Sequence, residues 1–243
     1  MIREGADFIE IGGESTGPNS KDISVDEELK RTIPVIQAIH KTYPESKLAI
    51  DTWKSAVATK AIEAGATMVN DVTAGRGDSE MFSIIADACR GTACCAPTDV
   101  RYVLMYSKDS TPRTTIEDRR YDDVVTTIKT FLVSRRNAAT NSGVDPERII
   151  LDPGLGHFIS SDPAYSFEII ARLQEFRLLG CPIFLSPSRK SFLAGPENLP
   201  TAERLPGTIA ASAAAVLHGA SYIRTHDVAA VRRGCEIISM MQT

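Results

Sequence analysis

The 243-residue chain is long for one average domain but ordinary for a single α/β barrel, and its 43% hydrophobic residues are enough for a sizeable core. A net charge of −4 argues against a nucleic-acid-binding surface as its main role. No apolar run approaches the roughly 20 residues that span a bilayer, so neither nucleic acid nor a membrane is an expected partner.

The cysteines and the first residues both indicate a reducing compartment. The five cysteines, an odd number, include no CxxC pair, and the adjacent Cys94 and Cys95 suit neither a simple disulfide nor a zinc site. The opening residues MIREGADF lack the apolar segment of a signal peptide. We therefore expect free thiols and a cytoplasmic protein.

Short apolar runs alternate with helical patterns along the chain. Seven runs are expected as strands, at residues 7–13, 47–51, 67–71, 101–107, 148–154, 181–188 and 221–227. Helical patterns follow them at residues 25–43, 55–65, 80–91, 121–143, 164–176, 207–220 and 228–242. Ser24 and Glu27 have the spacing of a capping box, and Gly65 and Gly143 are natural helix stops.

A strand followed by a helix, seven times over, predicts parallel strands with right-handed crossovers. Seven units are one fewer than a (β/α)8 TIM barrel has, and MIREGAD reads like the last turn of a helix that enters a strand. We therefore expect such a barrel lacking its first βα unit, with residues 1–243 as a single domain. The competing fold is a doubly wound open sheet, but GGEST is not the GxGxxG loop usual after its first strand.

Polar side chains gather where the predicted strands end. In a parallel barrel the functional residues lie at the carboxyl ends of the strands. Those ends carry Glu14-Ser15-Thr16, Asp51-Thr52, Asn70-Asp71, Met105-Tyr106-Ser107, Asp152-Pro153-Gly154, Ser188-Arg189-Lys190 and Arg224-Thr225-His226-Asp227. One aspartate at a strand end is more often a helix cap than a ligand-binding group. Seven such ends on one rim predict a binding site.

The polar residues sort into two chemical groups. Asp51, Asn70 and Asp152 offer hydrogen-bond acceptors and one amide, which suit an amidine-like or guanidine-like edge such as that of a pterin or guanine. Arg224 and His226 are two apart on a strand, so they point the same way.

With Lys190 and the hydroxyl of Thr16, Arg224 and His226 suit an anion such as pyrophosphate. Other roles are considered for four residues on this rim. His226 also fits a turn residue at a helix start, Lys190 and Arg189 also fit a solvated loop, and for Asp227 the cap of the last helix is the preferred interpretation.

The motifs resemble those of the dihydropteroate synthase family over essentially the whole chain. They are IGGEST, IDTWKSAVATKAIEAGATMVNDV, YDDVV, ILDPGLG, SRKSFL and IRTHDV, in the family's order and spacing. The resemblance implies a TIM barrel of the folate pathway, a sulfonamide target, that joins 6-hydroxymethyl-7,8-dihydropterin pyrophosphate to 4-aminobenzoate. It also implies Mg2+ as cofactor and a homodimer formed through the last helices.

Carried over by position, the resemblance implies roles for individual residues. The pterin would be held by Asp51, Asn70, Asp152 and Lys190. The pyrophosphate and the aminobenzoate would be held by Thr16, Ser188, Arg224 and His226. The residues expected to carry the catalysis are Lys190, Arg224 and His226. The reaction implied is dissociative, which needs leaving-group charge neutralised and water excluded.

Some positions depart from the family pattern. The family's first strand, with its magnesium-binding asparagine, has no counterpart here, so no metal ligand is assigned. Gly17 stands where an arginine is usual, Tyr106 where a histidine is usual, and GHFIS replaces the usual glycine-phenylalanine-glycine-lysine. The alternatives are a non-catalytic pterin-binding paralogue, a pterin-dependent methyltransferase domain, or an aldolase that uses Lys190 as a Schiff base.

Overall fold

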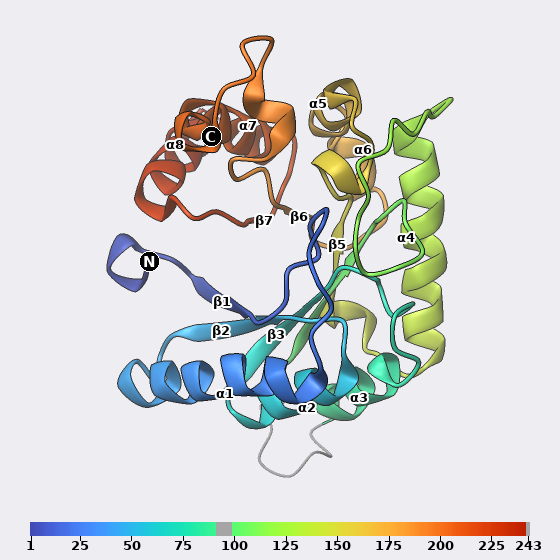
Figure 1. Cartoon of the computed structure of the whole chain (residues 1–243), viewed down its shortest axis with the longest axis vertical. Coiled ribbons are helices and arrows are strands. Elements are labelled where there is room, and N and C mark those ends of the chain that lie inside the picture. The colour runs from blue at the N-terminus through green and yellow to red at the C-terminus, as the bar shows by residue number, and fades with distance from the viewer. Residues whose placement is uncertain (91–98, 242–243) are drawn as a thin grey trace.

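The protein is a curled layer of parallel strands wrapped by helices (Figure 1). The computed structural model describes residues 1–90 and 99–241. Five strands pair in chain order: β1 (Phe8–Gly12), β2 (Lys47–Asp51), β3 (Ala66–Asp71), β4 (Arg101–Met105) and β5 (Ile149–Asp152). A second parallel pair comprises β6 (Phe184–Leu185) and β7 (Tyr222–Ile223). A bridge between Leu151 and Ile183 joins the two sheets.

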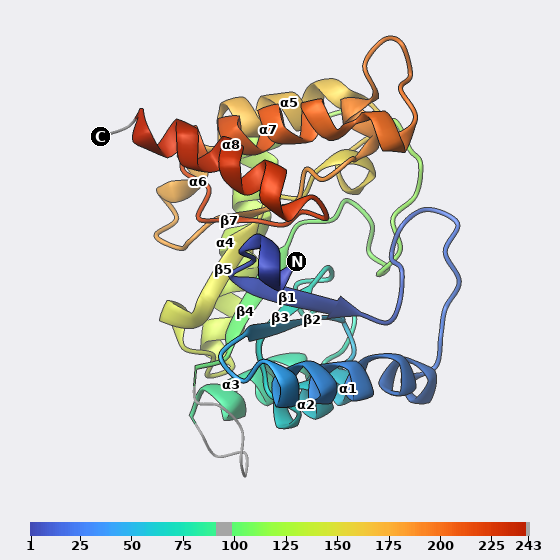
Figure 2. The same cartoon turned by 90° about the vertical axis from the view of Figure 1, so that its left-hand side faces the viewer.

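The helices cover the outer face of this curled sheet, as Figures 1 and 2 show together. They are α1 (Val25–Thr42), α2 (Ser55–Glu63), α3 (Met81–Cys89), α4 (Val124–Asn141), α5 (Pro163–Ala171), α6 (Gln174–Arg177), α7 (Leu205–Leu217) and α8 (Val228–Met240). The predicted parallel α/β barrel architecture is confirmed. None of the described helices combines the length and apolar character needed to cross a bilayer.

The capping residue and the glycine stops predicted from the sequence are confirmed at several helix ends. Ser24 Oγ accepts a hydrogen bond from the Glu27 amide at 3.2 Å, as in a capping box. Gly65 and Gly143 have φ of 111° and 95°, where a residue with a Cβ is strained. The residues before β1 form a short 3-10 turn, Ile2–Glu4, as the predicted end of a helix would.

Other boundaries were wrong. The helix expected at 164–176 divides into α5 and α6, because Leu173 and Phe176 turn into the core through i→i+3 bonds. The runs expected as strands at 181–188 and 221–227 form strands of only two residues each, β6 and β7. Cys94, Cys95 and the predicted end of the third helix at residue 91 lie outside the described residues. Cys89, Cys181 and Cys235 are free thiols.

The strand alternation produces two apolar layers. Outward side chains such as Leu48, Val69 and Leu104 pack beneath the helices in the larger core. Inward side chains fill the lumen, and they are Ala49, Met68, Val103, Ile150 and Phe184. Because successive side chains alternate between faces, the inward positions two residues further along β2, β3 and β5 are Asp51, Asn70 and Asp152. The lumen therefore changes from apolar to polar towards the carboxyl ends of the strands.

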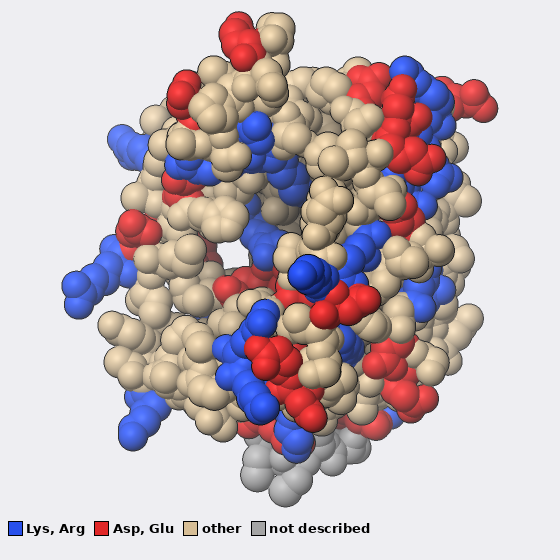
Figure 3. All heavy atoms as spheres, in the orientation of Figure 1, with Lys and Arg blue, Asp and Glu red and all other residues tan. Residues whose placement is uncertain are grey.

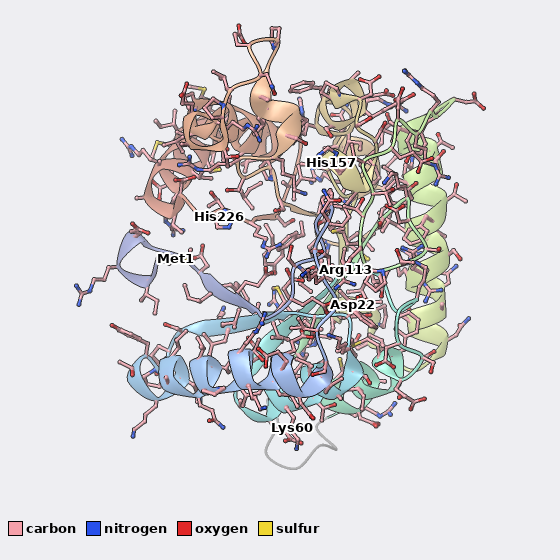
Figure 4. All side chains as sticks on the ribbon, in the orientation of Figure 1. Met1, Asp22, Lys60, Arg113, His157 and His226 are labelled. Atoms are coloured by element: carbon pink, nitrogen blue, oxygen red, sulfur yellow. The ribbon has the colours of Figure 1, made fainter. Side chains whose placement is uncertain are left out.

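One side of the curled sheet is open. Among the described residues no backbone pairing joins β7 to β1. A cavity of about 900 Å³ lies between them, lined by β1, β7 and α8, and Figure 3 shows an opening through the molecule there. Met1 and His226 line this cavity, and Figure 4 shows them on opposite sides of the opening. The cavity also reaches Glu10 and Arg224, so it meets the polar end of the lumen.

The turn after β5 yields a stability prediction. Gly154 has φ of 75°, and a Cβ there would lie 2.6 Å from the Tyr106 carbonyl oxygen. Gly180 has nearly the same φ, 76°, with nothing within 4 Å of its Cβ position. We expect Gly154→Ala to lower the free energy of unfolding by about 2–4 kcal/mol and Gly180→Ala by about 1 kcal/mol. Urea unfolding of both variants measures this, and equal losses would contradict it.

Candidate active site

Six polar side chains converge at the carboxyl end of the lumen, and we call them the polar cluster. They are Glu10, Asp51, Asn70, Asp152, Lys190 and Arg224. Five of the six were predicted from the sequence. Glu10 was missed, although its inward position two residues before Gly12 in the apolar run FIEIGG was a usable signal.

Arg224 is the centre of the acidic half of the polar cluster. Its Nη2 donates to Asp51 Oδ2 at 2.9 Å and also forms an ion pair with Glu10. Glu10 in turn accepts a hydrogen bond from Asn70 Nδ2 at 3.1 Å. Asp51 pairs in register with Asn70 on β3 and with Gly12 on β1, which places these groups side by side. One cation therefore balances two neighbouring carboxylates, and part of its side chain, 40%, is exposed.

Lys190 enters the polar cluster from the loop after β6. Its Nζ donates to the Leu155 carbonyl at 3.2 Å and lies 5.3 Å from the centre of the Phe158 ring. The side chain is partly buried, so the alternative of a solvated loop lysine is wrong. GHFIS, a departure from the family pattern, thus supplies the ring against which Lys190 lies.

Arg189 holds this loop in place. Its Nε and Nη2 donate to the two carboxylate oxygens of Asp227 at 2.8 and 2.7 Å, and its backbone has φ of 51°. Asp227 stands at the N-cap position of α8, but its side chain binds Arg189 and makes no cap hydrogen bond, so the expected capping role was wrong. Arg189, with its strained backbone and its two hydrogen bonds to Asp227, positions the next residue, Lys190, in the lumen.

Burial and charge bring the pKa values of three cluster residues between about 6 and 8. Burial raises the pKa of Asp152 to about 6, against the opposing effect of Lys190. Burial lowers the pKa of Lys190 to about 8, opposed by Asp152. Burial raises the pKa of Glu10 to about 7, although Arg224 pulls it down. Three groups that titrate between pH 6 and 8 in one place are typical of a functional site.

The expected anion-binding residues are only partly brought together. His226 Nδ1 lies 3.0 Å from Ser188 Oγ, which also accepts from the His226 amide at 3.2 Å. His226 and Arg224 both line the cavity beside β1. Thr16 lies on the loop after β1, where its carbonyl accepts from the Thr114 amide at 3.0 Å, and no described contact joins its side chain to the polar cluster.

A buried ion network fixes the loop that carries Thr16. Lys54 Nζ, on the loop after β2, binds Glu14 at 2.7 Å and Glu28 of α1 at 2.6 Å. Glu14 also accepts from the Trp53 indole and pairs with Arg113, which reaches across from the loop after β4. Glu14 was among the predicted strand-end residues, but its ion pairs were not predicted, because these partners meet only when four elements assemble.

Arg113 links the loop after β4 to the loop after β1. It pairs with Asp22 as well as Glu14, and Figure 4 shows Arg113 and Asp22 together near the rim. The next residue, Thr114, donates from its hydroxyl to the His157 carbonyl at 2.7 Å. Burial lowers the pKa of His157, and the nearby Lys108 and Lys190 lower it further, which favours the neutral form of this rim histidine. Tyr106, another departure, is buried and bonded to Tyr121, so it packs in the core.

The fold and the site define an α/β-barrel enzyme with a candidate ligand site at the carboxyl ends of its strands. A family model described as "Pterin binding enzyme" matches residues 1–226. The chain belongs to the dihydropteroate synthase family, and its members are transferases.

The relatives agree over most of the chain. The dihydropteroate synthase of Clostridium beijerinckii is 36% identical over 229 residues, 94% of this chain and 77% of that protein. That of Bacillus subtilis is 34% identical over 99% of this chain and 77% of its own length.

Solved structures agree as well. The synthase of Xanthomonas albilineans with 4-aminobenzoic acid is 34% identical, has a TM-score of 0.88, and is matched over 100% of this chain and 81% of that one. The same enzyme in complex with 7,8-dihydropteroate is 32% identical with a TM-score of 0.82, matched over 100% of this chain and 84% of that one.

The buried ion network yields a second prediction. Lys54→Met removes the cation between two buried carboxylates, so we expect the free energy of unfolding to fall by about 3–5 kcal/mol. Lys60→Met removes an exposed pair with Glu63, and we expect a change of at most about 1 kcal/mol. Thermal and urea unfolding at pH 7 measure both; similar losses would show that the network is not what holds this loop.

Proposed function

We propose that the chain transfers the dihydropterin methylene group of 6-hydroxymethyl-7,8-dihydropterin pyrophosphate to the amine of 4-aminobenzoate, giving 7,8-dihydropteroate and pyrophosphate. The observation that carries this proposal is the polar cluster, with three carboxylates and an amide set against two cations. Membership of the dihydropteroate synthase family supports the same chemistry. Residues 1–243 would act as one pterin-binding domain.

The acceptors of the polar cluster suit the donor-rich edge of a pterin. Asp51, Asn70 and Asp152 would take the ring's amino and imino hydrogens, and Asp152 is nearly inaccessible, with 2% exposed. Lys190 would lie against the opposite edge, as it now lies against Phe158. Buried carboxylates with few other donors leave unmet hydrogen-bonding capacity, which a ligand of this kind satisfies.

The cations suit the leaving group. In the reaction the methylene C–O bond breaks and its electron pair leaves with pyrophosphate. The amine nitrogen then bonds to the methylene carbon and gives a proton to solvent. Arg224 and His226, with Ser188 and Thr16, would stabilise the charge that develops on the pyrophosphate.

Magnesium is not placed among these residues. Among residues 1–90 and 99–241, no group of three or more His, Cys, Asp or Glu side chains is arranged to hold a metal ion. Mg2+ is commonly bound through one or two carboxylates plus substrate phosphates. A Mg2+ ion would therefore be held chiefly by the phosphates of the substrate, and no step above depends on it.

The assembly and compartment are also proposals. Leu217 of α7 and Ile237 of α8 are 45% and 43% exposed, which supports pairing of two copies through these helices. A homodimer predicts twice the monomer mass in light scattering. The free thiols described are compatible with the cytoplasm.

The test of the function is an assay of the purified chain with both substrates and Mg2+, following dihydropteroate formation. We expect turnover, with kcat/KM lower by about 100-fold or more in Lys190→Ala and Asp152→Asn, because each removes a charged contact to the pterin. Lys60→Ala, an exposed lysine, serves as the control. Absence of both turnover and pterin binding would contradict the proposal, whereas binding alone would favour a non-catalytic pterin-binding protein.

The pH dependence gives a separate prediction. With a pKa of about 8, Lys190 is charged below that pH and neutral above it. We therefore expect kcat/KM for the pterin substrate to fall as the pH rises through about 8. In Lys190→Arg the cation persists, so this fall should disappear even if turnover is lower. An alkaline limb that is unchanged in Lys190→Arg would show that another group titrates there.

A further inference from the structure

Glu10 is a buried carboxylate that the proposed reaction does not use. It lies inside the lumen on β1, in register with Ala49, one layer below Asp51. Its side chain is 13% exposed, and it contacts Arg224 and Asn70 directly. A carboxylate at this depth is costly unless its partners need it there.

The contact to Asn70 is informative because the two groups have different hydrogen-bonding abilities. An ionised carboxylate only accepts, whereas an amide has a donating nitrogen and an accepting oxygen. The side-chain nitrogen of Asn70 must therefore face Glu10, as the 3.1 Å contact shows. The amide oxygen, Oδ1, is buried and has no hydrogen-bond partner among the described residues. A buried acceptor without a donor is rare and calls for a ligand N–H.

We propose that Glu10 is a positioning residue that fixes the orientation of the Asn70 amide, keeping its oxygen available to accept from an N–H of the pterin edge. The inference rests on the proposed function, in which Asn70 belongs to the pterin site. Asp51 and Asp152 accept regardless of orientation. Asn70 is the one amide of the polar cluster, so its hydrogen-bonding sense depends on a neighbour.

This role predicts a change in specificity. A pterin carries a 2-amino group, a donor, on its pyrimidine ring, whereas the corresponding lumazine carries an oxygen, an acceptor, at the same place. An amide held with its oxygen towards the ligand favours the donor and rejects the acceptor. An amide free to turn discriminates less. A residue that only stabilised the fold would not alter this preference.

The protonation of Glu10 should therefore affect binding. A protonated carboxyl can donate to Asn70 Oδ1, which lets the amide turn. Burial raises the pKa of Glu10 to about 7. Among its neighbours, Arg224 and Asn70 lower this pKa, whereas Asp51 and Asp152 raise it. Pterin preference should thus strengthen as the pH rises through about 7. Asp152 titrates nearer 6, so the two effects separate in a variant that lacks only Glu10.

The experiment is calorimetric binding of 6-hydroxymethylpterin and 6-hydroxymethyllumazine to the full chain between pH 5.5 and 9. In the wild type we expect the pterin:lumazine affinity ratio to rise about tenfold around pH 7. In Glu10→Gln, which can donate or accept, the ratio should be about tenfold lower at pH 8 and lack that rise. Asp7→Asn, which removes an exposed carboxylate just before the same strand, is the matched control and should behave as wild type.

The outcomes separate this inference from the function on which it rests. If the wild type binds pterin but its pterin:lumazine affinity ratio does not change around pH 7, the inference is overturned. This outcome needs no variant, so the test remains decisive even if Glu10→Gln folds poorly. A folded Glu10→Gln with wild-type ratio and pH profile overturns it as well. Failure of the wild type to bind pterin at any pH would overturn the proposed function itself, and this inference with it.

Discussion

Charge balance inside the lumen is the constraint on which the site depends. Three carboxylates, Glu10, Asp51 and Asp152, meet two cations, Lys190 and Arg224, where the apolar filling of the barrel ends. Buried charges of this kind persist only when each has a partner, so the position of one fixes the others. Burial moves three pKa values in this cluster into the range between about 6 and 8, and the neighbouring charges modify each shift. The chemistry of the site and its pH dependence therefore have one physical origin.

The loops around the lumen are held by ion pairs of the same kind. Arg189 binds Asp227 through two hydrogen bonds and so presents Lys190. On the other side, Lys54 lies between Glu14 and Glu28, which holds the loop carrying Thr16. Loops tied by buried, directional contacts lose little entropy when a ligand binds. The loops around the lumen are therefore held by ion pairs whose separation would cost free energy.

Through the open side between β1 and β7, part of the polar cluster also faces a cavity. Glu10 and Arg224 belong to the cluster and also line the cavity of about 900 Å³ beside β1. In Figure 3 the opening is bordered by acidic and basic side chains. The electrostatic environment of Glu10 therefore depends on what fills that cavity, since water there would weaken its interaction with Arg224.

The sequence by itself determined the alternation of strands and helices, several helix ends and five of the six cluster residues. These follow from local rules: period-2 patterning, capping and glycine stops need only near neighbours. Tertiary structure alone decided that Glu10 joins Arg224, that Asp227 binds Arg189 and leaves α8 uncapped, and that Lys54 bridges two helix-loop units. These contacts join residues 26 to 214 positions apart in the chain, from Glu28 and Lys54 to Glu10 and Arg224. No local pattern specifies which distant charges meet, because closure of the strand layer brings them together.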